Sequence, residues 1–175
     1  MRSPRAIAAR ALAAAVRVSA RYDLSRRMLN RLYNAMTPRQ RQWAHGRYSK
    51  LFHHSSDRVQ PGTWNVRFAG RAIALPFSGG DARLEWDAAL SILGHETEIV
   101  ETYRALLQRG PRPATVLDVG SNYGLQSLLW LVHGVRVISV EPNARCHAYF
   151  ETICRLNGVR NDIRPQALGD APGTA

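Results

Sequence analysis

The segment VLDVGSNYG at residues 116–124 decides the fold of this chain. An apolar strand, Thr115–Val119, runs directly into a turn of the form D-x-G-x-x-x-G, and a helix is expected from Gly124 to His133. Glycine suits such a turn because it adopts positive φ angles and lets a ligand approach the backbone with no Cβ in the way. The segment therefore predicts a strand–turn–helix unit that binds a ligand at the carboxyl end of a parallel strand.

Further strands and helices alternate after this unit. The pattern predicts a strand at Val135–Val140, a helix at Ala144–Asn157 and a short strand at Ile163–Leu168. Strands separated by single helices at this spacing form a parallel sheet with crossover connections. We therefore expect an α/β fold with a Rossmann-like part of about three parallel strands over residues 114–175.

An acidic residue follows the second strand at the distance that nucleoside binding requires. Glu141 lies 21 residues after Gly120 and is placed to accept hydrogen bonds from a ribose diol. A dehydrogenase is the main alternative, but its turn has the closer glycines of G-x-G-x-x-G and holds a pyrophosphate. Asp118 would repel a pyrophosphate, whereas it can accept a hydrogen bond from an amine such as a methionine α-ammonium.

The turn and the strand ends supply the predicted cofactor contacts. Gln166 and Ala167 are expected to end the third strand, where the adenine edge would lie, and Asp170 is expected in a turn. Asn122 has two interpretations, a contact with the cofactor or a cap for the following helix. No catalytic base is predicted. The predicted cofactor-binding residues are Asp118, Gly120, Ser121, Asn122, Gly124, Glu141, Gln166 and Ala167.

Three short motifs point to one family. DVGSNYG, VEPN and QALGD closely resemble the FkbM-type methyltransferases, and the His95-Glu96 pair in GHETE also looks like that family's pattern. The resemblance covers roughly residues 90–175, and Ser121 stands where the family usually has alanine. It implies S-adenosylmethionine-dependent O-methylation of a sugar, glycolipid or similar hydroxyl acceptor. It also implies a class I methyltransferase sheet of seven strands, of which this chain supplies three.

An incomplete sheet leaves two functional interpretations open. The first is a methyltransferase, or a piece of one that is inactive by itself. The second is a cofactor-binding remnant or interaction module without turnover. We expect the part of the domain that binds the acceptor to be absent from this chain.

The basic residues are concentrated at the N-terminus. Residues 1–60 hold 13 lysine and arginine residues against Asp23 and Asp57, so they carry the whole net charge of +11. Helices are expected at 5–21, at 24–36 and from 38 to about 54. This basic helical extension is interpreted as solvated, as a contact for an anionic membrane surface, or, as the weakest alternative, as a nucleic-acid contact.

The rest of the chain is predicted as one domain, residues 61–175, with a hairpin at 64–77 and a helix at 94–108.

Cys146 and Cys154 lie about 12 Å apart along one predicted helix, too far for a disulfide. Two reduced core thiols suit the cytoplasm, where the protein is expected, either free or peripheral at the membrane. The histidines lack partners at ligand spacing, so no metal site is predicted.

Overall fold

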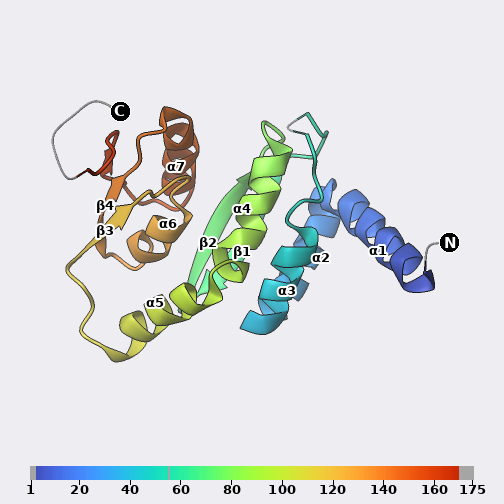
Figure 1. The fold of residues 1–175 in the computed structure, drawn as a ribbon, viewed down its shortest axis with the longest axis horizontal. Coiled ribbons are helices and arrows are strands. Elements are labelled where there is room, and N and C mark those ends of the chain that lie inside the picture. Colours follow the sequence, from blue (N-terminus) through green and yellow to red (C-terminus); the bar gives the residue numbers. More distant parts are fainter. Residues whose placement is uncertain (1–2, 55, 170–175) are drawn as a thin grey trace. The chain divides into compact units, whose positions relative to one another are not determined.

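The computed structural model describes residues 3–54 and 56–169 (Figure 1). This part of the chain has an α/β fold with a parallel sheet of three strands and a separate antiparallel hairpin, as the sequence predicts. The helices are α1 Pro4–Ala20, α2 Asp23–Ala35, α3 Pro38–Tyr48, α4 Ala82–Gly94, α5 Thr97–Arg109, α6 Leu125–Leu131 and α7 Ala144–Leu156. The strands are β1 Gly62–Phe68, β2 Arg71–Phe77, β3 Thr115–Val119, β4 Arg136–Val140 and β5 Ile163–Arg164.

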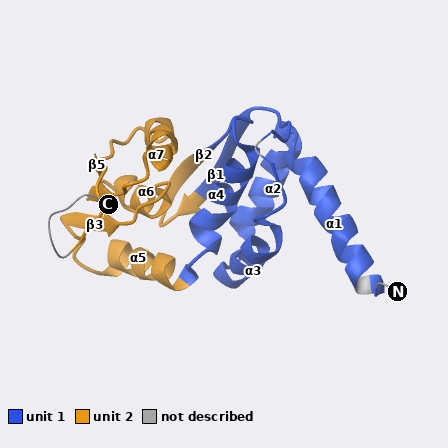
Figure 2. Ribbon diagram, turned by 45° about the horizontal axis from the view of Figure 1, so that its top comes forward, with its two compact units in different colours: residues 1–66, 75–97 blue, residues 67–74, 98–175 orange. Residues whose placement is uncertain are grey.

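The chain divides into two compact units (Figure 2). Unit 1 comprises residues 1–66 and 75–97, and unit 2 comprises residues 67–74 and 98–175. The β1–β2 hairpin therefore contributes its base to unit 1 and its tip to unit 2. Ala69 and Gly70 form the two-residue turn, and both have positive φ, 44° and 87°, as tight hairpin turns require.

Aromatic side chains form the core of unit 1. Trp86 of α4 lies edge-on to Trp64 of β1, Phe77 of β2 and Phe52, with ring centroids 5.2–6.0 Å apart. Its indole N–H donates to the Tyr48 carbonyl at 2.7 Å, so the buried polar atom of this side chain is satisfied.

The helices between residues 38 and 109 differ from the sequence expectations in three ways. The third helix ends at Tyr48 rather than near residue 54, and α4 was not predicted at all. The helix expected from residue 94 begins instead at Thr97, because His95 is extended and Glu96 has a φ of 47°. Buried side chains surround α4 on most sides, which removes the one-sided periodicity from which amphipathic helices are recognised.

The parallel sheet of unit 2 has the order β3-β4-β5. The β3–β4 register pairs Asp118 with Ser139 and Val119 with Val140. Three parallel strands in sequential order, joined by α6 and α7, are compatible with one half of a doubly wound Rossmann-like sheet. Leu128 and Leu129 of α6 are fully buried.

The outer strand β3 departs from the expected burial. An apolar parallel strand is expected to have helices on both faces. Leu117 and Val119 are instead exposed, and β3 pairs only with β4 among the described residues. The sheet within this part of the chain thus has an open edge and an uncovered apolar face.

The third strand is shorter than predicted. It ends at Arg164 rather than Leu168, because the Gln166 amide, the next donor that would face β4, bonds within its own segment. The Gln166 amide donates to the Arg164 carbonyl at 2.9 Å and turns the chain away from the sheet. Gln166 and Ala167 therefore do not end a strand, which corrects the sequence interpretation.

Candidate cofactor-binding site

The turn between β3 and α6 folds back onto the end of the neighbouring strand. The Val140 carbonyl accepts hydrogen bonds from the amides of Gly120 and Ser121, at 2.8 and 3.1 Å. Gly120 and Asn122 both have positive φ, 71° and 49°. These bonds bring the turn to the carboxyl ends of β3 and β4, where open α/β sheets bind their ligands.

The two glycines of the turn have different physical roles. A Cβ on Gly124 would lie 2.2 Å from Cδ2 of Phe150, so this position allows α6 to approach α7 closely. A Cβ on Gly120 would meet no atom within 4 Å. The Gly120 backbone therefore faces open space, as a backbone that receives a ligand must.

Asp118 is held by the first turn of α6. The Ser127 hydroxyl donates to its Oδ2 at 2.5 Å and lies 2.8 Å from the Ser139 hydroxyl. The Ser127 amide also hydrogen-bonds this carboxyl. Burial raises the pKa of Asp118, and the two bonds from Ser127 oppose that rise. Asp118 thus caps α6, whose N-terminal Gly124 has no side chain to do so.

Glu141 ties the turn to the start of α7. Its Oε2 accepts from the Asn122 amide at 2.9 Å, and its Oε1 accepts from the Asn143 amide at 2.8 Å. The side chain is buried. A carboxylate has about four lone-pair directions, so each oxygen still has acceptor capacity after these bonds.

Asn122 does not cap the following helix, because the N-cap residue of α6 is Gly124. Its side-chain oxygen instead accepts from the Cys146 thiol at 3.2 Å. Both Cys146 and Cys154 are free and buried, which confirms the expectation of two unpaired core thiols. The Cys146 contact fixes the Asn122 side chain against α7.

The predicted site residues fall into two groups. The structure brings Asp118, Gly120, Ser121, Asn122, Gly124 and Glu141 together around the carboxyl ends of β3 and β4. Gln166 and Ala167 are exposed in the segment after β5. Asp170 lies outside the described residues. His95 and Glu96 belong to unit 1.

Sequence reasoning missed the residues that support this site. Ser127, Ser139 and Asn143 each bond to a predicted site residue or to its partner. Serines on an otherwise apolar helix and strand signal a buried polar contact, so Ser127 and Ser139 were recognisable in principle. Asn143 is the N-cap of α7, accepting from the Arg145 amide at 3.1 Å.

One polar atom in the turn has no partner. The Ser121 hydroxyl is buried and makes no hydrogen bond with any residue that the structure describes. Buried hydroxyls are nearly always paired. The Ser121 hydroxyl follows the open Gly120 backbone, so a polar ligand bound there could supply its missing hydrogen bond.

Two comparisons with known proteins found no match. No protein-family model matches the chain, and no curated protein matches it either.

Within residues 3–54 and 56–169, no three histidine, cysteine or acidic side chains gather in a way that could hold a metal ion.

Proposed function

We propose that unit 2 binds S-adenosylmethionine through the β3–α6 turn and Glu141, as part of a class I methyltransferase. The observation that carries this proposal is the Glu141 carboxylate, which two backbone amides hold at the end of β4 with acceptor capacity left on both oxygens. A ribose diol offers two neighbouring hydroxyl donors that match these oxygens. The unpaired Ser121 hydroxyl and the open Gly120 backbone support a ligand at the same place.

The other groups of the turn fit the methionine end of this cofactor. Asp118 has one oxygen bonded to the Ser127 hydroxyl and retains acceptor capacity for an ammonium group. Its negative charge disfavours a pyrophosphate, which argues against a dinucleotide. S-adenosylmethionine supplies an activated methyl group, and the expected acceptor is a sugar, glycolipid or similar hydroxyl. The residues of this chain bind and orient the donor.

A second candidate function is cofactor binding without turnover. The exposed Leu117 and Val119 favour it, because an acceptor next to the cofactor needs a second wall of the cleft. Methyl transfer depends on holding donor and acceptor in line. We propose that residues 1–175 bind the cofactor but do not transfer its methyl group by themselves.

Two assays separate these functions. Calorimetry with S-adenosylhomocysteine, with NAD as the control ligand, tests cofactor binding; heat from NAD alone would reject the proposal. Transfer from labelled S-adenosylmethionine to a panel of sugars and glycolipids then tests turnover. Binding without transfer supports the non-catalytic module, and clear transfer by residues 1–175 shows that the uncovered face of β3 does not prevent catalysis.

A further inference from the structure

Helix α2 presents its polar side to the protein and its apolar side outward. Its buried residues are Arg26, Asn30 and Tyr33. Leu24, Met28 and Leu32 recur every four residues and are 75%, 63% and 62% exposed. Helices on protein surfaces normally bury such a stripe. We name these three residues the α2 apolar stripe.

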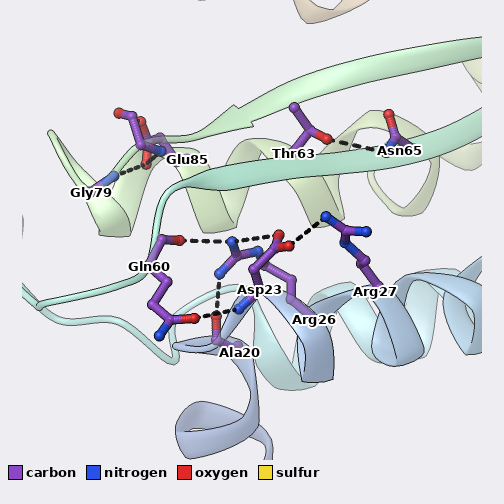
Figure 3. Close-up of polar contacts among 10 residues, drawn as sticks. Ala20, Asp23, Arg26, Arg27, Gln60, Thr63, Asn65, Gly79 and Glu85 are labelled. Carbon is purple, nitrogen blue, oxygen red and sulfur yellow. Dashed lines mark hydrogen bonds and ion pairs between the residues drawn. The ribbon is translucent and has the colours of Figure 1, made fainter.

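A buried arginine holds α2 in this orientation (Figure 3). The Arg26 guanidinium donates to the Ala20 carbonyl at 2.9 Å and to the Gln60 carbonyl at 2.7 Å. It also pairs with Asp23 at 3.3 Å and lies over the Phe77 ring, 4.5 Å from its centroid. Removing these bonds from a fully buried charge would be costly, so α2 cannot rotate to bury its stripe.

The other end of the same helix face is fixed as well. The Tyr33 hydroxyl donates to the Leu90 carbonyl at 2.7 Å, which connects α2 to α4. Arg41 of α3 donates to the Tyr33 carbonyl at 3.2 Å. The polar face is thus bonded along its length, and the α2 apolar stripe stays on the surface of the folded unit.

The surroundings of the stripe are strongly basic. Arg27 and Arg31 are exposed on the same helix. Both acids of residues 1–60 already contact arginines, Asp23 with Arg27 at 2.7 Å and Asp57 with Arg17 at 2.8 Å. Residues 1–60, with their net charge of +11, therefore attract an anionic surface and repel the same region of a second copy of the chain.

We propose that the α2 apolar stripe docks on the surface of an anionic lipid bilayer. Leucine and methionine side chains enter the boundary between headgroups and acyl chains, while the neighbouring arginines contact lipid phosphates and carboxylates. A nucleic acid would use the arginines but leaves the apolar stripe exposed to water. Among the described residues, no helix is both long and apolar enough to cross the bilayer, and docking in the plane of its surface needs no such helix.

The test uses the full chain with vesicles of phosphatidylcholine, with and without phosphatidylserine. We expect sedimentation with the phosphatidylserine vesicles and a strong loss of binding at high salt. The variant Leu24→Ser/Met28→Ser/Leu32→Ser should bind on the order of 100-fold more weakly. The matched control Ile99→Ser/Leu106→Ser/Leu156→Ser removes three exposed apolar side chains from other helices and should bind as the parent does.

A charge variant completes the test. Arg27→Glu/Arg31→Glu should also weaken binding on the order of 100-fold, whereas Arg109→Glu/Arg155→Glu, in unit 2, should change it little. Unchanged binding of the serine variant would overturn the proposal, and so would equal binding to both kinds of vesicle. Two further results would overturn the proposal by assigning the stripe to another partner. One is salt-sensitive binding to RNA without vesicle binding, and the other is a dimer that the serine substitutions dissociate.

Discussion

The Glu141 carboxylate accepts a hydrogen bond from the Asn122 amide at 2.9 Å, although the two residues lie on different strand–helix connections. This bond joins the turn after β3 to the end of β4. The acid predicted to bind a ribose is therefore also a structural support for the turn. Variants of Glu141 must be examined for both stability and ligand binding.

Replacement of Glu141 by alanine should reduce both properties. It leaves the Asn122 and Asn143 amides without their acceptor, and hydrogen bonds to a charged group are worth about 1.5–3 kcal/mol. We expect S-adenosylhomocysteine affinity to fall roughly 10- to 100-fold and the unfolding free energy to fall as well. Calorimetry and denaturant unfolding measure the two effects, and an unchanged dissociation constant would show that Glu141 does not contact the ribose.

The two turn glycines should respond differently to alanine. Gly124→Ala should lose about 2–5 kcal/mol of stability, because strain at positive φ adds to a clash with the Phe150 ring. Gly120→Ala meets no neighbouring atom, so it should lose only the 1–2 kcal/mol or so of the φ strain. Denaturant unfolding compares the pair, and equal losses would contradict the close packing of α6 on α7.

Asp118 should make stability depend on pH. Its pKa in the folded chain is raised by burial above the ordinary value of 3.8, so the folded state holds the proton more tightly than the unfolded state. The whole contribution of Asp118 to the unfolding free energy is therefore present below pH 3.8, and it is lost as the pH rises through the raised pKa. Asp118→Asn keeps an acceptor for Ser127 but has no proton to lose, so this loss should disappear.

Unfolding of the parent and Asp118→Asn across the acidic range measures that difference. The substitution should also remove the attraction for the methionine ammonium and weaken S-adenosylhomocysteine binding. Parallel pH profiles for the two proteins would mean that Asp118 titrates alike in the folded and unfolded states.

The neighbouring arginines of α2 should differ greatly in their contribution. Arg26→Ala leaves the Ala20 and Gln60 carbonyls without their donor and should cost about 3–5 kcal/mol. Arg27 makes an ion pair with Asp23 at 2.7 Å, but its side chain is 70% exposed. Arg27→Ala should therefore cost under about 1 kcal/mol. Thermal unfolding compares the two, and a comparable loss from both would refute the buried role of Arg26.

Local patterns predicted the parts of the fold that have strong local causes. Strand β3 has its predicted bounds, because an apolar run specifies it, and α7 ends within one residue of its prediction, because Gly158 with its positive φ stops the helix. The turn and Glu141 also meet as their spacing predicts. Local patterns do not predict whether another strand pairs with the free edge of β3, the edge opposite β4.

Other features depend on tertiary contacts. The spacing of Leu24, Met28 and Leu32 predicts a stripe but not its direction, which the buried Arg26 decides. The end of β5 depends on the hydrogen bond from the Gln166 amide to the Arg164 carbonyl, which no pattern in the sequence predicts. The double role of Glu141 was also beyond sequence reasoning, because its amide partners come from the fold of the turn.

Amide NMR of the 19.6 kDa chain tests the central claim most directly. Added S-adenosylhomocysteine should shift the amide signals of Gly120, Ser121, Asn122 and Glu141, and NAD at the same concentration should leave them in place. Saturating shifts at these four residues would locate the cofactor at the ends of β3 and β4. Absence of any shift there, or shifts caused by NAD and not by S-adenosylhomocysteine, would contradict the proposed site.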